Sequence, residues 1–200
     1  MKLIVGLGNP GRNYTESRHN AGFSVIKALT KNYKIPLKKD TFFLSGKGRI
    51  GLESLILALP LTFMNLSGIA VSALIKKYKI DLENLLVVCD DLDLGFGVIK
   101  IRPNGSSGGH RGLESIIDSL GSQEFARLRI GIGRPLEGNT DAASFVLSPF
   151  TKREKGEMKE IIEVACGCCR AWAKKGITGS MNIFNGTGKY KTLSHTTAKI

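Results

Sequence analysis

Two spacings of hydrophobic residues alternate along the chain. Short apolar or alternating runs fit β-strands, whereas segments with an apolar residue every three or four positions fit helices that lie on a sheet. The runs predict strands at residues 2–7, 42–50, 54–59, 85–89, 97–102 and 127–132. The helical spacing predicts helices at residues 21–33, 67–79, 112–120 and 151–175. Because strands and helices alternate, we expect an α/β fold with helices packed on a central sheet.

The connections between the predicted strands indicate a mixed sheet. The strands at 42–50 and 54–59 are joined at Gly51, and this connection is too short for a parallel crossover. A chain of 200 residues fits one domain, and no linker divides it. We therefore expect a single domain, with a mixed central β-sheet flanked by helices, over residues 1–185. Residues 186–200 are polar and basic, and we expect them to form a flexible tail.

The charge of the chain indicates a polyanionic partner. The net charge is +12, from 29 basic and 17 acidic side chains. Residues 1–50 carry ten basic and two acidic side chains, and residues 151–200 carry ten and four. A basic surface of this kind attracts nucleic acid, although an otherwise ordinary basic enzyme would look the same.

Several classes of protein do not fit the sequence. No apolar run approaches the ~20 residues of a membrane helix. The apolar residues 2–7 are too few for a signal peptide, so we expect them to form the first strand. Three of the four cysteines, Cys166, Cys168 and Cys169, crowd into one predicted helix, and no second pair completes a zinc site. We interpret them as structural thiols in a reducing compartment, which indicates the cytoplasm.

One glycine motif resembles a dinucleotide-binding loop. Residues 6–11 read Gly-Leu-Gly-Asn-Pro-Gly directly after a strand, which satisfies G-x-G-x-x-G. However, Pro10 removes a backbone donor where a pyrophosphate would be held, and residues 12–20 separate the third glycine from the next helix. No acidic residue follows about 20 positions later to hold a ribose. Dinucleotide binding is therefore disfavoured.

A second glycine motif resembles the nucleophile elbow of serine hydrolases. Residues 105–109 read Gly-Ser-Ser-Gly-Gly between a strand and a helix, which satisfies G-x-S-x-G. Ser107, an aspartate (Asp118 or Asp141) and His195 even follow one another in the order of a triad. His195 lies in the polar tail, however, where nothing would hold it. The alternative is a flexible glycine-rich loop over a site, and Ser107→Ala distinguishes the two.

Four polar residues, Asn9, His19, Asn65 and Asp90, form the most informative set. Asn9 and Asp90 follow predicted strands, where sites of α/β sheets collect. A histidine oriented by an aspartate can take a proton from water near neutral pH, and two amides can stabilise an oxyanion. Each residue also has a simpler explanation: Asn9 in a turn, Asn65 as a helix cap, His19 in an exposed loop and Asp90 as an acid at a strand end.

Longer motifs around these residues resemble the signatures of the bacterial peptidyl-tRNA hydrolases. They follow one another in order from residue 2 to about residue 147. The matching segments are Lys2–Gly11 with Tyr14 and Arg18–Gly22, then Thr62–Gly68, Asp90–Leu94 with Gly97, Gly105–Leu113 (Arg111 excepted), and Arg127–Pro135. This resemblance implies a single α/β catalytic domain over residues 1–185. It also implies hydrolysis of the ester that joins a peptide to the 3′ end of tRNA.

The resemblance also implies roles for particular residues. His19 would be the general base and Asp90 would orient it, while Asn9 and Asn65 would bind the peptide and the scissile carbonyl. Further residues are implied to bind substrate, namely Tyr14, Met64, Asn20 and Arg111. Basic residues implied to meet tRNA phosphates are Arg102 and Arg129, with Lys100 and Arg127 as weaker candidates. The family is implied to be cytoplasmic and monomeric, with peptidyl-tRNA as its partner and with no metal or cofactor.

Two alternatives stay open. Many family members have asparagine where this chain has Arg111, and arginine donates hydrogen bonds but cannot accept them. An RNA-binding relative that has lost catalysis is therefore a second hypothesis, against which the retention of the four polar residues argues. The acidic run at residues 90–93 suggests a metal, but we see no neutral metal ligands near it and expect no metal.

Overall fold

A seven-stranded sheet forms the centre of the molecule, which we describe from a computed structural model for residues 1–135 and 141–186. The strands are β1 (Lys2–Gly6), β2 (Lys38–Lys39), β3 (Phe43–Ile50), β4 (Glu53–Pro60), β5 (Leu85–Asp91), β6 (Ile99–Arg102) and β7 (Ala126–Gly131). The α-helices are α1 (Ala21–Asn32), α2 (Ser67–Tyr78), α3 (Arg111–Leu120), α4 (Ala142–Leu147) and α5 (Lys152–Phe184). Short 3-10 helices are η1 (Arg12–Tyr14), η2 (Arg18–Asn20), η3 (Met64–Leu66) and η4 (Leu82–Asn84).

The order of the strands is β2-β3-β4-β1-β5-β7-β6, and the sheet is mixed as predicted. The four central strands β4, β1, β5 and β7 run parallel, whereas β3 pairs antiparallel with β4 and β6 with β7. Gly51, with φ 64°, forms the tight turn between β3 and β4. The predicted α/β class with a single mixed sheet and flanking helices is therefore confirmed.

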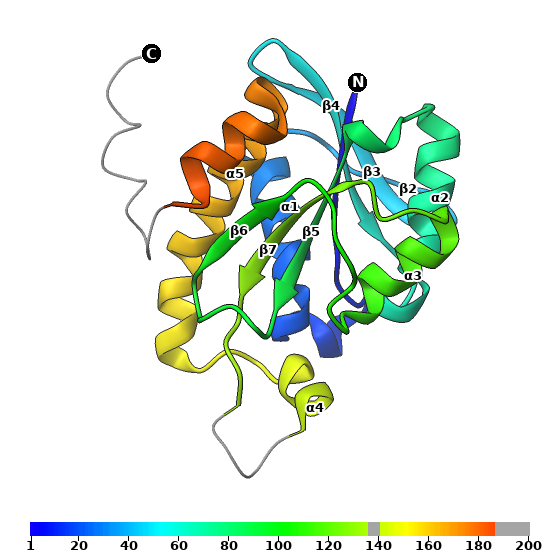
Figure 1. Ribbon diagram of the computed structural model, residues 1–200. Helices are drawn as coiled ribbons and strands as arrows, with labels where there is room; N and C mark the ends of the chain where they lie inside the picture. The colour runs from blue at the N-terminus through cyan, green and yellow to red at the C-terminus, as the bar shows by residue number, and fades with distance from the viewer. Residues whose placement is uncertain (136–140, 187–200) are drawn as a thin grey trace.

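Helices cover both faces of the sheet (Figure 1). On one face α1 and α5 pack over side chains such as Ile4, Leu86 and Leu128. On the other face α2 and α3 pack over Leu3 and Val87 among others. Because successive side chains of a strand point to opposite faces, the nearly continuous apolar runs supply both layers at once. The carboxyl ends of the parallel strands are left accessible between the two layers.

The predicted helix at residues 151–175 matches the first part of α5, which continues beyond a break at Gly176 to Phe184. Gly176 breaks it with φ 70° and ψ −171°, where a side chain would be strained. Lys2 Nζ donates to the carbonyls of Trp172 and Ala173 at 2.8 and 3.0 Å and satisfies acceptors that the break releases. Neither β2 nor α4 was predicted, since each is too short to show a periodic pattern.

The three clustered cysteines lie inside α5 and are buried in the core against α1. Burial raises the pKa of the Cys166 thiol to about 12, so this thiol stays protonated and inert. The placement agrees with structural thiols. Within residues 1–135 and 141–186, none of the helices combines the length and the apolar character that a membrane span requires. The predicted tail and His195 lie outside the described residues.

The helix α1 approaches β1 and β5 very closely at Gly22. A Cβ at this position would overlap the carbonyl oxygen of Val88 and the backbone nitrogen of Leu7. We expect Gly22→Ala to lower the free energy of unfolding by roughly 1–3 kcal/mol, measured by urea denaturation, because backbone atoms must move apart. The control is Gly156→Ala on α5, where a Cβ meets open space and should add about 0.5–1 kcal/mol of stability. Equal effects at both positions would contradict the close approach.

Candidate active site

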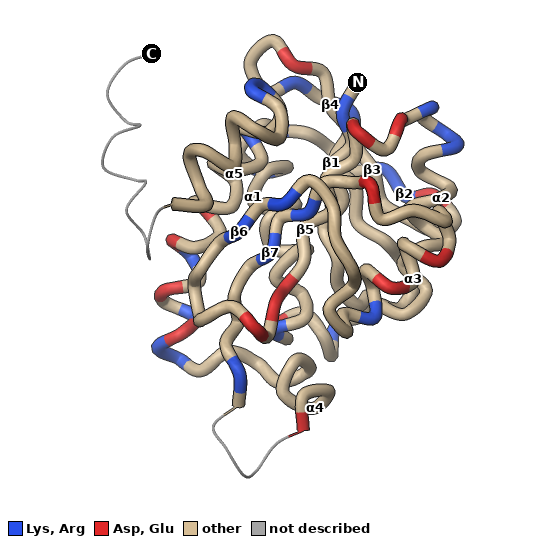
Figure 2. Tube along the Cα trace, viewed as in Figure 1, with Lys and Arg blue, Asp and Glu red and all other residues tan. Residues whose placement is uncertain are grey.

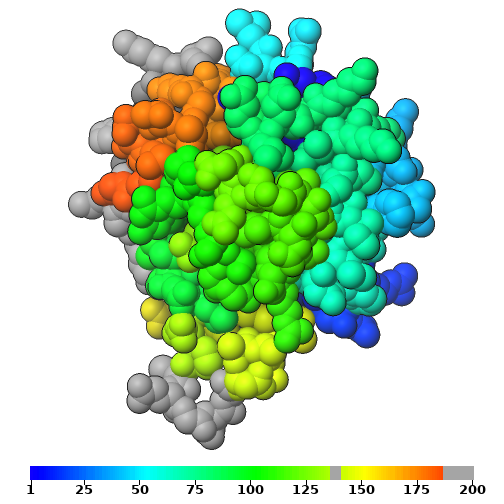
Figure 3. All heavy atoms as spheres, turned by 45° about the vertical axis from the view of Figure 1, so that its right-hand side comes forward, coloured from blue at the N-terminus to red at the C-terminus, as the bar shows by residue number. Residues whose placement is uncertain are grey.

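A pocket of about 500 Å³ opens where the central strands end. It lies between the glycine-rich loop that precedes α3, the segment around η3 and the short helix α4. In Figure 3 the yellow surface of α4 lies below the green surface around α3. Polar residues of the lining are Asn9, His19, Asn65, Asp90, Asp91, Asp93, Ser107, His110, Arg111, Arg129 and Arg134. The pocket thus gathers residues that lie far apart in the sequence, from Asn9 to Leu147.

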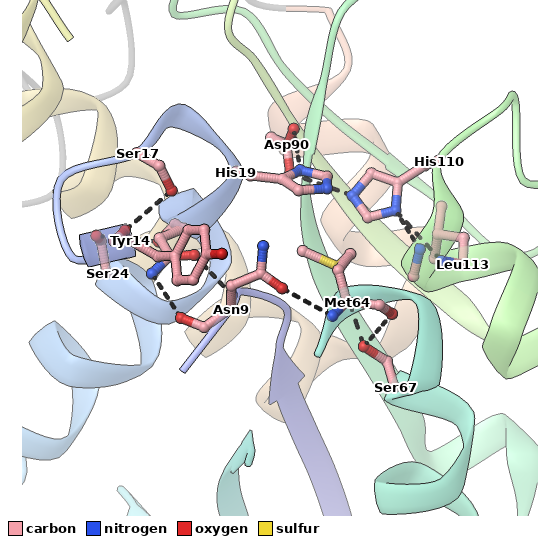
Figure 4. Close-up of polar contacts among 12 residues, drawn as sticks. Asn9, Tyr14, Ser17, His19, Ser24, Met64, Ser67, Asp90, His110 and Leu113 are labelled. Carbon is pink, nitrogen blue, oxygen red and sulfur yellow. Dashed lines mark hydrogen bonds and ion pairs between the residues drawn. The ribbon is translucent and has the colours of Figure 1, made fainter. Parts of the chain in front are cut away.

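A carboxylate lies between two histidines at the floor of the pocket (Figure 4). Asp90 is the last residue but one of β5 and is 3% exposed, and His19, in η2, is 8% exposed. His19 Nδ1 lies 2.9 Å from both carboxylate oxygens of Asp90, and His110 Nε2 lies 3.1 Å from Oδ1. The pairing of His19 with Asp90, which sequence analysis expected, is therefore present, and the explanation of His19 as an exposed loop residue is wrong.

His110 was assigned no role from the sequence. It is the N-cap of α3, and its Nδ1 accepts hydrogen bonds from the backbone of Gly112 and Leu113 at 3.1 and 3.2 Å. Nδ1 therefore carries a lone pair, so the ring proton of neutral His110 sits on Nε2 and points to Asp90. The signal available in the sequence was its place just before a predicted helix, although histidine is not among the usual caps.

The hydrogen bonds fix which nitrogen of His19 can act as a base. Nδ1 donates to the ionised carboxylate of Asp90, so the lone pair of neutral His19 lies on Nε2. Burial by itself would raise the pKa of the Asp90 carboxyl, but the charge and hydrogen bonds of His110 and His19 outweigh burial. The pKa of Asp90 therefore lies below its usual range. A buried anion thus orients a neutral imidazole, which is the arrangement of a general base.

The same three side chains are also near enough to one another to suggest a metal site. Their ligand atoms lie within 4.8 Å of one another, so the expectation that Asp90 has no neutral metal ligands near it is wrong. His110 nevertheless fits poorly, because α3 fixes the proton of its ring on Nε2, the nitrogen that would have to bind the metal. The donor set is therefore better suited to two hydrogen bonds than to a cation.

Asn9 is held so that one half of its amide faces the pocket. Its side-chain oxygen accepts from the backbone of Met64 at 2.8 Å, which leaves the amide nitrogen as a donor. Its backbone N–H donates to Asn20 Oδ1 at 2.8 Å, and its carbonyl accepts from Asn20 Nδ2 at 3.1 Å. Asn20 is 3% exposed and absent from the pocket lining, so it positions Asn9 rather than contacting substrate as implied.

Of the other implied substrate contacts, Asn65 and Met64 line the pocket and Tyr14 does not. Asn65 lies exposed in η3 and lines the pocket, and no side chain caps the start of α2, so its explanation as a helix cap is wrong. Met64 is 4% exposed and also lines the pocket. Tyr14 stands outside the lining, with its ring edge-on to Phe63 at 6.4 Å between centroids. Phe63 is exposed and lines the pocket, so its ring lies between Tyr14 and the pocket.

The implied phosphate-binding residues lie on one face of β6 and β7. Lys100 pairs with Arg129 and Arg102 with Arg127 across the antiparallel ladder, which places all four side chains on the face opposite α5. In Figure 2 the basic positions of β6 and β7 are blue, and the acidic carboxyl end of β5 is red. Arg102 is exposed, whereas Arg129 is ion-paired with the buried Asp91.

Arg127 departs from the expected phosphate contact. It is only 2% exposed, and its guanidinium donates to the carbonyls of Gly105, Ser106, Gln123 and Phe125. The side chain therefore anchors the glycine-rich loop from beneath and is not available to a phosphate in this conformation. Arg127 lies within β7, and the sequence does not show that the glycine-rich loop will cover its side chain.

The serine-hydrolase alternative finds no support at Ser107. Its hydroxyl accepts from Gly109 N at 3.3 Å, and both ring nitrogens of the neighbouring His110 are already engaged.

Arg111 is the first residue of α3, is exposed, and lines the pocket. Its guanidinium has no partner among the described residues, whereas Arg129 and Arg134 are each paired with an aspartate.

Known proteins match this chain over nearly its whole length. A family model described as peptidyl-tRNA hydrolase matches residues 3–192. A peptidyl-tRNA hydrolase of Syntrophomonas wolfei subsp. wolfei is 47% identical over 186 residues, which are 92% of this chain and 100% of the relative. One of Brevibacillus brevis is 42% identical over 190 residues, which are 94% and 100%. The crystal structure of peptidyl-tRNA hydrolase from Acinetobacter baumannii superimposes with a TM-score of 0.87 at 38% identity, covering 93% of this chain and 95% of that one.

The fold and these relatives define an enzyme, a hydrolase that acts on ester bonds. The chain belongs to the peptidyl-tRNA hydrolase family, which confirms the resemblance seen in the sequence.

Proposed function

We propose that the chain hydrolyses the ester between a peptide, or an N-blocked amino acid, and the 3′ end of tRNA. This reaction would recycle tRNA from prematurely released peptidyl-tRNA. The observation that carries the proposal is the 2.9 Å pairing of His19 Nδ1 with Asp90 in a pocket lined by Asn9 and Asn65. An ester is easier to cleave than an amide, so an activated water suffices and no serine nucleophile is needed.

The positions of the protons on the side chains of the site support a direct attack by water. His19 Nε2 takes a proton from water as the oxygen attacks the ester carbonyl, and the imidazolium that forms is stabilised by Asp90. The amide nitrogens of Asn9 and Asn65 donate to the developing oxyanion. When the intermediate collapses, the bond to the ribose oxygen breaks, and His19 returns the proton to this leaving oxygen. The products are free tRNA and a peptide carboxylic acid.

Basic side chains of β6 and β7 would contact the tRNA phosphates. We expect Arg102→Ala and Arg129→Ala chiefly to weaken tRNA binding and to lower the slope of log K against log salt by about one each. Fluorescence titration with tRNA at several salt concentrations measures both quantities. The control is Arg49→Ala, an exposed arginine of β3 near the other edge of the sheet, which should leave the slope unchanged. If turnover of bound substrate falls while the slope stays constant, these residues belong to the chemistry.

The direct test of the proposed function is cleavage of N-blocked aminoacyl-tRNA by the purified protein. Cleavage of this substrate, with unblocked aminoacyl-tRNA left intact, is the expected result. The second candidate, an RNA-binding relative without catalysis, is favoured only by Arg111 in place of the family's usual asparagine. It predicts tight binding of tRNA with no cleavage of either substrate.

We propose further that the enzyme works in the cytoplasm as a monomer, without a metal or cofactor. The free cysteines fit a reducing compartment, and the ring proton of His110 on the nitrogen that faces Asp90 disfavours a metal at this place. Activity that persists in the presence of a chelator is the expected result.

A further inference from the structure

Arg18, the residue before the proposed base, is a buried cation outside the pocket. It is 4% exposed and donates two parallel hydrogen bonds to Glu154 of α5, at 2.8 Å from Nη1 and 2.7 Å from Nη2. Its guanidinium also lies over the rings of Phe145 and Phe150, with centroids 4.4 and 4.9 Å away. A bidentate pair with stacking is the geometry that arginine forms and lysine cannot.

The backbone around Arg18 joins the same segments. The N–H of Arg18 donates to the carbonyl of Ser148 at 3.0 Å, and Ser17 forms an isolated β-bridge with Pro149. Glu154 is itself fixed, because its carboxylate accepts from the N–H of Thr151 at 2.8 Å in a capping box. η2 is therefore fastened to the connection between α4 and α5.

We propose that Arg18 is a positioning residue, which through Glu154 and Phe145 keeps His19 facing Asp90 and holds α4 as a wall of the pocket. The inference rests on the proposed function, because it takes His19 as the base. Residues 142, 143, 146 and 147 of α4 line the pocket, and Phe145 on the same helix packs on Arg18. One side chain thus links the wall that meets substrate to the turn that carries the base.

A neighbouring ion pair shows why the Arg18 pair is the one that positions the turn. Lys155 and Glu16 join the same two segments at 2.7 Å, but their side chains are 45% and 67% exposed. Exposed pairs contribute little to stability and fix little geometry. The side chains of Arg18 and Glu154 are 5% and 23% exposed, so breaking their pair leaves a buried guanidinium without its carboxylate. Although burial opposes it, the contacts with Arg18 and Thr151 lower the pKa of Glu154 to about 2.

The experiment compares Glu154→Gln and Arg18→Lys with Glu16→Gln on N-blocked aminoacyl-tRNA. Glu154→Gln removes a charge. Arg18→Lys keeps both charges and loses only the two parallel hydrogen bonds and the stacking on the rings. Titratable groups that face His19 are Asp90 and His110, and none of the variants alters them. Measurements are kcat and KM across pH, with thermal unfolding to report the folded fraction.

Both Glu154→Gln and Arg18→Lys should lower kcat/KM by roughly 10–100-fold, because small displacements of a catalytic group have effects of this size. Both should also move the acid limb of the pH profile to lower pH, because an imidazolium displaced from Asp90 is less stabilised. Glu16→Gln should change neither quantity. If Arg18→Lys does not fold, Phe145→Leu on the exposed α4 should shift the limb in the same direction by a smaller amount.

A fall in rate that matches the loss of folded protein, with the acid limb unchanged, would overturn the proposal and leave Arg18 a purely structural residue. A wild-type protein that cleaves no N-blocked aminoacyl-tRNA would instead refute the proposed function. The two failures are therefore distinguishable in one set of measurements.

Discussion

His19→Ala is expected to lower kcat by roughly 10²–10⁴, the usual contribution of a general base. The methyl group cannot take the proton from the attacking water, and His110 cannot replace His19 because its nitrogens are occupied by α3 and Asp90. Single-turnover cleavage of N-blocked aminoacyl-tRNA measures the effect free of product release. Affinity for tRNA should stay near that of the wild type, since the basic patch lies on β6 and β7.

Ser107→Ala is the matched control for this prediction. Ser107 also lines the pocket, but its hydroxyl contacts only a backbone N–H of its own loop among the described residues. A rate close to that of the wild type is expected. A near-normal rate for His19→Ala, or a large loss for Ser107→Ala, would mean that the base or the nucleophile is misassigned.

Hydrophobic spacing predicted most of the fold because it reports burial directly. The parallel strands are buried on both faces and show continuous apolar runs, as at residues 85–89, where all five positions are buried. The spacing did not place the end of α5, because a glycine after the last periodic residue is typical of a helix end, whereas the chain becomes helical again after the break at Gly176. It could not show α4 either, since a helix of six residues with no buried side chain leaves no pattern.

The site was predictable where a residue's role follows from its place at a strand end, and less so where the role depends on distant partners. Asp90 and Asn9 follow strands that pair side by side, so their proximity could be expected. Their connection to His110 depends on how α3 begins, and the burial of Arg127 depends on the loop above it. Arg18 looked like part of a polar loop, because its partner Glu154 is 136 residues away in the sequence.

Asp90→Asn should have an effect of comparable size to His19→Ala, a loss of roughly 10³–10⁴ in kcat, by analogy with the orienting aspartate of a triad. An amide carries no charge to stabilise the imidazolium, and it can present N–H rather than oxygen to His19 and favour the wrong tautomer. The control is Asp93→Asn, another carboxylate of the pocket, which is exposed and should matter little.

The pH dependence identifies which group carries the acid limb. Because the pKa of Asp90 lies below its usual range, this carboxylate stays ionised wherever histidine titrates, so protonation of Asp90 cannot cause a limb near neutral pH. With His19 as the base, the acid limb should move to lower pH in Asp90→Asn, where the imidazolium has lost its counter-charge. Profiles of kcat/KM from about pH 5 to 8 measure this shift. An unmoved limb would mean that Asp90 and the base are not coupled during catalysis, and the carboxylate would then serve the fold of the pocket alone.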